Sequence, residues 1–206
     1  MAVRYKMRNK IIFFIDTNIW LDWKYTKRGN KGSKELMGLL TRHDTCLYIY
    51  LPYFAKQELI YQILEWEREK HLLGQGYSIR EIPQQKGDFK LPSTKNNRIL
   101  GEIKRILRTP KIIHGKSKEI DSSLFEKLVS NEFGFADALI LANLLHSCKV
   151  EDIRIEYFIT RDDFLKKFRD HYTNLFPKRM QISGPSPGLC EQIKKRFRIK
   201  EIEKML

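Results

Sequence analysis

The sequence has few cysteines and no long apolar segment, and both absences exclude classes of protein. Cys46, Cys148 and Cys190 are odd in number and widely spaced, which argues against a disulfide framework. Without a Cys-x-x-Cys pair, a zinc ribbon is excluded as well. No stretch is long and apolar enough to cross a membrane, and the apolar run near the N-terminus is too short for a signal-peptide core. We therefore expect a cytoplasmic protein that does not contact a membrane.

Acidic residues are also scarce relative to basic ones. The chain of 206 residues has 39 Lys and Arg against 25 Asp and Glu, a net charge of +14, and its hydrophobic content of 42% is enough for a core. Such a charge favours a polyanionic partner, nucleic acid before membrane. Most of the excess lies at about 70–118, with twelve basic and three acidic residues. The alternative for this stretch is a solvated face without a partner.

Apolar segments alternate with helical patterns along the chain. Residues 11–15, 46–51 and 155–160 are typical of buried strands. The alternation predicts an α/β fold in which helices cover a parallel sheet. We expect a domain over 1–183 with a basic insertion at about 70–118. The Gly-Pro-Ser-Pro-Gly segment at 184–188 is the linker of a second unit, 184–206, which continues as a basic C-terminal helix. This helix either binds a partner or packs on its own domain.

Four carboxylates are the candidate site residues. Asp16 and Asp162 each follow an apolar strand, at the edge of the sheet where open α/β folds bind ligands. Asp137 shares a helical face with Ile140 and Leu141, and a charge on a core-facing side is costly unless it is paired or metal-bound. Glu58 lies in the helix after the second strand. For each aspartate the alternative is a helix cap, and Asp163 competes with Asp162 for either role.

Gathered carboxylates without basic neighbours repel one another, which raises their pKa values unless a divalent cation neutralises them. Ligation by oxygen alone suits Mg²⁺ or Mn²⁺. One or two such ions can activate water and stabilise charge on a phosphodiester. A basic rim supplies the complementary surface for a nucleic-acid backbone.

The pattern of these motifs resembles that of a known family. Ile-Asp-Thr-Asn at 15–18, Glu58, Ala-Asp-Ala-Leu-Ile-Leu-Ala at 136–142 and Ile-Thr-Arg-Asp at 159–162 are similar, in order, to the acidic motifs of PIN-domain ribonucleases, which include the VapC toxins. The resemblance covers about residues 10–167. It implies a three-layer α/β/α sandwich and endonucleolytic cleavage of RNA that depends on Mg²⁺ or Mn²⁺.

The resemblance also implies roles for individual residues. Asp16, Glu58, Asp137 and Asp162 are similar to the metal-binding carboxylates, Asn18 to the residue that orients the first aspartate, and Thr160 to the hydroxyl beside the fourth. In the implied mechanism a metal-activated water attacks the phosphorus, and cleavage leaves a 5′-phosphate and a 3′-hydroxyl. We nominate no side-chain general base. The expected partners are RNA, an antitoxin or other protein, and a second copy in a homodimer. The basic residues that we expect to contact nucleic acid are Arg98, Lys104, Arg105 and Arg161.

Other functions compete with this interpretation. A PIN-like RNA-binding module without catalysis is disfavoured because all four acids are present. A phosphatase of the haloacid-dehalogenase type also has an aspartate after an apolar strand, but it requires a second aspartate two positions later, where this chain has Asn18. The toxin assignment is in question as well, because the stretch between Glu58 and Asp137 is long and basic.

Overall fold

A parallel sheet of five strands is the centre of the structure, a computed structural model that describes residues 10–24, 30–43, 45–85, 89–131, 133–161 and 180–199. Its strand order is β3-β2-β1-β4-β5, and every neighbouring pair is parallel. The strands are β1 (Ile11–Ile15), β2 (Leu47–Leu51), β3 (Ile112–His114), β4 (Ile155–Ile159) and β5 (Gln181–Ser183). The α/β fold and the parallel sheet expected from the sequence are confirmed, and the arrangement is consistent with a Rossmann-like sandwich.

The middle strand β1 is buried along its whole length, as a run of isoleucine and phenylalanine predicts. Its neighbours on both sides supply matching apolar residues. The ring of Phe13 stacks on that of Tyr157 in β4 with centroids 4.7 Å apart, and Phe14 pairs with Phe158 in the register of the two strands. These contacts fix where β1 and β4 end relative to each other.

The strand order places a topological switch point between β1 and β4. From β1 the chain moves outward through β2 to β3, and it then returns to the other side of β1 with β4 and β5. Parallel sheets of this kind bind ligands outside the carboxyl ends of the strands where the order reverses. Asp16 follows β1 and Thr160 follows β4, so both residues lie at that position.

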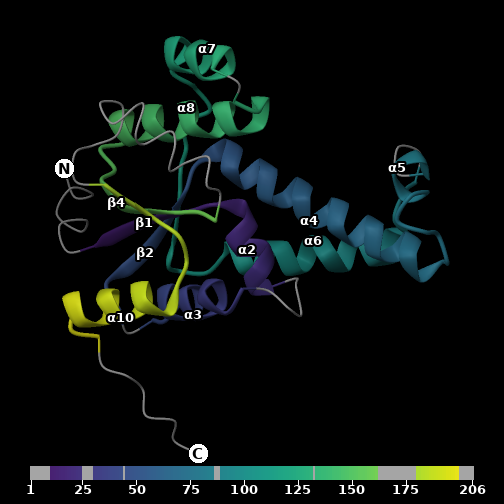
Figure 1. Cartoon of the computed structure of the whole chain (residues 1–206), viewed down its shortest axis with the longest axis horizontal. Helices are drawn as coiled ribbons and strands as arrows, with labels where there is room; N and C mark the ends of the chain where they lie inside the picture. Colours follow the sequence, from purple (N-terminus) through teal and green to yellow (C-terminus); the bar gives the residue numbers. More distant parts are fainter. Residues whose placement is uncertain are drawn as a thin grey trace, which may run out of the picture.

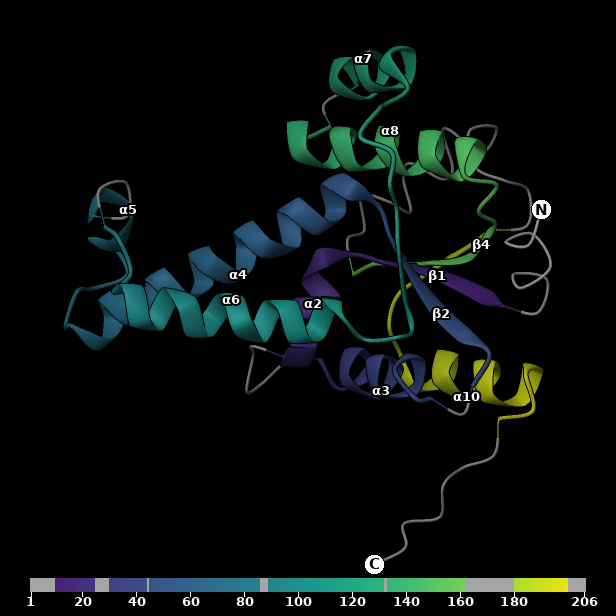
Figure 2. The same cartoon turned by 180° about the vertical axis from the view of Figure 1, so that it is seen from behind.

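The helices pack on both sides of the sheet and extend beyond one of its ends (Figure 1). Helices α7 and α8 lie on one side and α3 and α10 on the other, and a view from behind gives the same order (Figure 2). The described helices are α2 (Thr17–Lys24), α3 (Lys31–Leu40), α4 (Tyr53–Gly74), α5 (Ile82–Gln85), α6 (Ser93–Leu107), α7 (Ser122–Ser130), α8 (Phe135–Val150) and α10 (Pro187–Arg196). None of them is long and apolar enough to span a bilayer.

Helices α4 and α6 extend from the carboxyl end of the sheet as a projecting arm (Figures 1 and 2). They are held together at the far end by Lys95 of α6, whose Nζ lies 4.0 Å from Glu67 and 3.2 Å from His71, both on α4. Toward the sheet, Ile99 and Ile103 of α6 are buried in the core. The basic stretch at about 70–118 therefore includes α6 and only the end of α4, and it also supplies the edge strand β3.

The structure corrects several boundaries expected from the sequence. We expected Ser33 to cap α3, but its cap is Asn30, which accepts a hydrogen bond from the Ser33 N–H. Asp121, which the sequence assigns to the start of α7 rather than to the site, is the cap of this helix, in place of the capping box expected from Ser123 and Glu126. Strands β3 and β5 were not predicted, because segments of three residues carry too little periodicity.

The C-terminal helix α10 packs on its own domain. Leu189, Cys190 and Ile193 are buried, and the helix lies against α3 (Figure 1). We expected the helix to continue from Leu189 to the end of the chain, but it ends at Arg196. Arg198 there takes a left-handed conformation with φ of 51°, and the N–H of Ile199 bonds back to the carbonyl of Lys194, which closes the last turn.

Candidate functional site

Asp16 is held in place by donors from two strand ends. Its Oδ2 accepts a hydrogen bond from Asn18 Nδ2 at 2.9 Å and another from Thr160 Oγ1 at 2.5 Å. Asn18 is in the first turn of α2, and Thr160, only 3% exposed, directly follows β4. The carboxylate is therefore oriented across the switch point of the sheet. Asn18 thus contacts the aspartate that it was expected to orient, whereas Thr160, expected beside the fourth carboxylate, donates to the first.

Glu58 joins the same region from the second turn of α4. Its Oε2 accepts a hydrogen bond from Thr17 Oγ1 at 2.5 Å, which ties α4 to the start of α2. Burial raises the pKa of Glu58, the hydrogen bond from Thr17 opposes that rise, and the negative charges of Asp16 and Asp137 add to it. Asp16 and Asp137 are thus both close enough to Glu58 to act on its carboxylate electrostatically.

Asp137 is in the first turn of α8, and the prediction that it lies on the buried face of this helix is wrong. The side chain is exposed, while Ala138, Ile140 and Leu141 are buried. The reason is its place at the helix start, because Ala138 is the only residue of the first turn that reaches the core. Gly134 is the N-cap, so Asp137 does not have the capping role that was its alternative. A carboxylate in the first turn also interacts favourably with the helix dipole.

Asp162 and Asp163 lie outside the described residues, so the fourth predicted ligand and its competitor stay predictions. Within the part of the chain that the structure describes, no three His, Cys, Asp or Glu side chains converge as a metal site requires. The donor set nevertheless fits a hard divalent cation in its chemistry. Asp16, Glu58 and Asp137 offer only carboxylate oxygens. Burial is the main cause of the raised pKa of Glu58, and a cation would relieve the repulsion that adds to it.

Arg161 contacts the protein itself at the edge of this site. Its Nη1 lies 3.2 Å from Oδ2 of Asp22 in α2, and its Nη2 is 3.4 Å from the carbonyl oxygen of Asn18. Asp22 is only 4% exposed, and the same Oδ2 accepts a hydrogen bond from Ser33 Oγ at 2.9 Å. The guanidinium of this predicted nucleic-acid contact therefore connects the end of β4 to α2 and, through Asp22, to α3.

The other predicted nucleic-acid contacts, Arg98, Lys104 and Arg105, are exposed on α6. Arg105 lines a pocket between α6 and the end of α2, whereas Arg98 and Lys104 do not. Lys104 and Arg105 are thus neighbours on one helix, but only Arg105 lines the pocket.

Sequence reasoning missed three residues of this region. Thr17 stands between two nominated residues, but its partner Glu58 is 41 positions away. Asp22 and Ser33 pair with each other across two helices. The only local signal was an aspartate within the otherwise apolar pattern of α2, which alone does not identify a partner.

The comparisons with known proteins add no family assignment. No protein-family model matches the chain, and no curated protein matches its sequence.

Proposed function

We propose that the protein is an endoribonuclease that depends on Mg²⁺ or Mn²⁺ and hydrolyses RNA phosphodiesters at the carboxyl ends of β1 and β4. One observation carries the proposal. Three sequence segments meet at the end of β1, because Thr160 donates a hydrogen bond to Asp16 and Thr17 donates one to Glu58. These segments belong to three of the four motifs that resemble those of PIN-domain ribonucleases.

In this proposal Asp16, Glu58 and Asp137 would hold the cation together with Asp162. When bound, the cation supplies a Lewis acid for activating water and balancing charge on the phosphate. The chain itself holds two of the carboxylates in fixed orientations. Asn18 and Thr160 fix the carboxylate of Asp16, and Thr17 fixes that of Glu58. Hydrolysis adds water across one P–O bond and leaves a 5′-phosphate and a 3′-hydroxyl, as the resemblance implies.

Features around the acids support a nucleic-acid substrate. Exposed cations on α6 can contact backbone phosphates. Two helices that carry the acids also present exposed rings: Tyr61 on α4 is 59% exposed, and Phe135 on α8 is 67% exposed. Exposed aromatic rings can stack with unpaired bases. The homodimer and the antitoxin-like partner stay predictions of the resemblance.

The deciding experiment measures cleavage of labelled single-stranded RNA with Mg²⁺ or Mn²⁺. Asp137→Asn is expected to lower the rate on the order of 100-fold or more, because loss of one ligand misplaces the reacting groups, and EDTA is expected to stop the reaction. Asp152→Asn is the matched control. Asp152 is exposed just after α8, at the opposite end of that helix from Asp137, with φ of 53°, a conformation that asparagine also tolerates.

Circular dichroism must show that both variants are folded. RNA that is bound but never cut with either metal would contradict the proposal and favour an RNA-binding module without catalysis. Equal loss of activity in Asp152→Asn and Asp137→Asn would show that the effect is not specific to the candidate site.

A further inference from the structure

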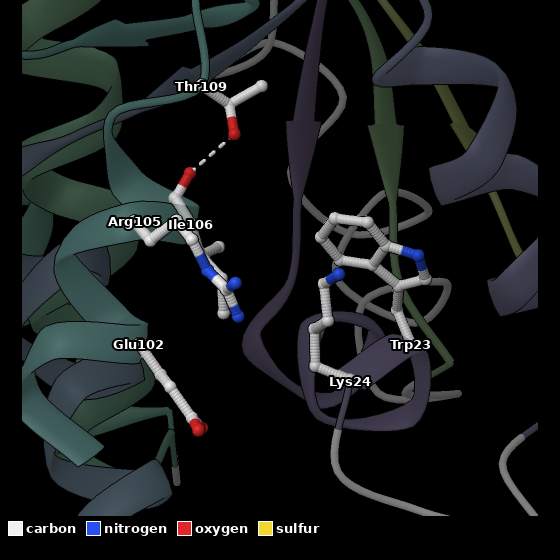
Figure 3. Close-up of a pocket in the computed structure, with 6 residues that line it drawn as sticks. All are labelled: Trp23, Lys24, Glu102, Arg105, Ile106 and Thr109. Carbon is white, nitrogen blue, oxygen red and sulfur yellow. Dashed lines mark hydrogen bonds between the residues drawn. The ribbon is translucent and has the colours of Figure 1, made fainter. Parts of the chain in front are cut away.

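A pocket of about 490 Å³ opens between the last turn of α2 and the second half of α6 (Figure 3). Its volume is in the range of small-molecule sites. It lies apart from Asp16, Glu58 and Asp137, although α2 connects the two regions. The pocket is lined by Trp23, Lys24, Glu102, Arg105, Ile106 and Thr109.

Two cations reach this pocket from different helices. The Nζ of Lys24 lies 3.9 Å from the centroid of the Trp23 ring, which holds the ammonium group beside the indole. Arg105 extends from α6 toward α2 (Figure 3). Neither cation forms an ion pair with any residue in the described ranges. Glu102 lies one turn before Arg105 and lines the same pocket, so the acidic and basic side chains together give the pocket a net positive charge.

The remaining lining residues indicate what kind of anion fits. The indole of Trp23 and the side chain of Ile106 are apolar surfaces, and the carboxylate of Glu102 accepts hydrogen bonds. A bare phosphate would use the two cations but would gain nothing from these groups. A nucleotide has a phosphate for the cations, a flat base for an aromatic or guanidinium plane, and, in most bases, amino or imino donors for a carboxylate.

The position of the pocket relates it to the acidic residues. Trp23 is six residues after Thr17 on the same helix, which corresponds to about 9 Å along the helix axis. We propose that the pocket binds one nucleotide of a single-stranded RNA, outside the bond that is cut. The inference rests on the proposed function, since it names a subsite for the same substrate. Arg105 and Lys24 bind the phosphate, and Trp23 supports the base.

The test compares Arg105→Gln with Arg154→Gln. Both residues are exposed and both changes remove one positive charge, but only Arg105 lines the pocket, and Arg154 is not among the expected nucleic-acid contacts. Binding of a labelled single-stranded RNA of about 12 nucleotides is measured by fluorescence anisotropy in EDTA, so that no RNA is cut. Arg105→Gln is expected to raise Kd roughly tenfold and to lower the salt slope by about 0.7, whereas Arg154→Gln raises Kd less than about twofold.

Two further measurements test the occupant. Trp23→Leu keeps an apolar wall without the ring, and it is expected to raise Kd by about fivefold or more, with thermal melting as the check on folding. A nucleoside monophosphate mixture is expected to displace the RNA at concentrations where inorganic phosphate does not. Equal displacement by inorganic phosphate would overturn the inference in favour of a simple anion site.

RNA binding in the pocket and RNA cleavage at the acidic residues can fail independently of each other. If Arg105→Gln and Arg154→Gln behave alike while cleavage still requires Asp137, the pocket inference fails and the ribonuclease proposal stands. If RNA binding requires Arg105 but no RNA is cut, the pocket stands and the catalytic proposal fails. Absence of any RNA binding by the wild-type protein overturns the pocket inference directly.

Discussion

At the scale of single residues, the carboxylate of Glu58 carries an electrostatic cost in the folded protein. Burial is the main reason that its pKa is raised, and the charges of Asp16 and Asp137 add to the effect. The hydroxyl of Thr17 lowers that cost by donating to the carboxylate. The ionised form of Glu58 is therefore less favourable in the folded protein than in the unfolded chain.

This electrostatic cost predicts a pH-dependent effect of Glu58→Gln on stability. A raised pKa in the folded state means that the folded protein binds the proton more tightly. The contribution of Glu58 to stability is thus fully present below its ordinary pKa and is lost as the pH rises through the raised value. Glutamine does not ionise and still offers an oxygen to Thr17. We expect Glu58→Gln to raise Tm at neutral pH by roughly 2 °C, and this gain disappears in acid.

Calorimetry from about pH 4 to 8 in a chelator measures this difference, with Glu126→Gln, an exposed substitution on α7, as the control. Adding Mg²⁺ should then reverse the order of the two proteins. A cation that binds the folded state stabilises wild type by mass action, whereas the variant has lost one ligand. A Tm of wild type that Mg²⁺ leaves unchanged would count against metal binding at this site.

At the scale of elements, the hydrogen bonds and ion pairs of Asp22 connect three segments. Its buried carboxylate accepts from Ser33 at the start of α3 and pairs with Arg161 just after β4. Because a buried carboxylate is costly without partners, these contacts fix α2 against the sheet end that carries Asp16. The arginine nominated from the sequence as a nucleic-acid contact therefore has a structural role.

We expect Arg161→Gln to lower the free energy of unfolding by about 1–3 kcal/mol, less than for a fully buried pair because Arg161 is partly exposed. Urea denaturation measures the change. Arg154→Gln is the matched control, since Arg154 is exposed just before β4 and has no ion pair with a described residue. If instead Arg161→Gln keeps wild-type stability and weakens RNA binding as much as Arg105→Gln does, the sequence-based role of a nucleic-acid contact is the correct one.

The elements also show what the sequence allows one to predict. The run Ile11–Ile15 identified the central strand, because apolar β-branched and aromatic residues on both faces require burial on both faces. The same reasoning nominated Asp16 through its position after that strand. It could not find the donors of the site, because Thr160 and Asp16 are 144 positions apart and only the sheet order brings them together. Asp137 was misplaced because the apolar pattern of α8 continues into its first turn, where only Ala138 is buried.

At the scale of the whole molecule, the C-terminal segment packs closely against α3. The backbone around Pro185 and Ser186, which leads into α10, passes directly over Gly32 in α3. A Cβ at Gly32 would lie 2.5 Å from the carbonyl oxygen of Pro185 and 2.8 Å from Cα of Ser186. Both neighbours are backbone atoms, so only a shift of the whole segment could accommodate a side chain.

This close approach predicts opposite effects for two glycine-to-alanine substitutions on the same helix. Gly38 is exposed on α3, and nothing lies within 4 Å of an added Cβ, so Gly38→Ala should stabilise by about 0.5–1 kcal/mol through helix propensity. Gly32→Ala gains less from propensity, because Gly32 is in the first turn of α3, and it must displace the segment before α10. We expect a net loss of about 1–3 kcal/mol. Chemical denaturation of both variants measures the difference. If Gly32→Ala also stabilised the protein, α10 would not be packed on α3 in solution, and the C-terminal helix would be free to act as the partner-binding arm that its charge allows.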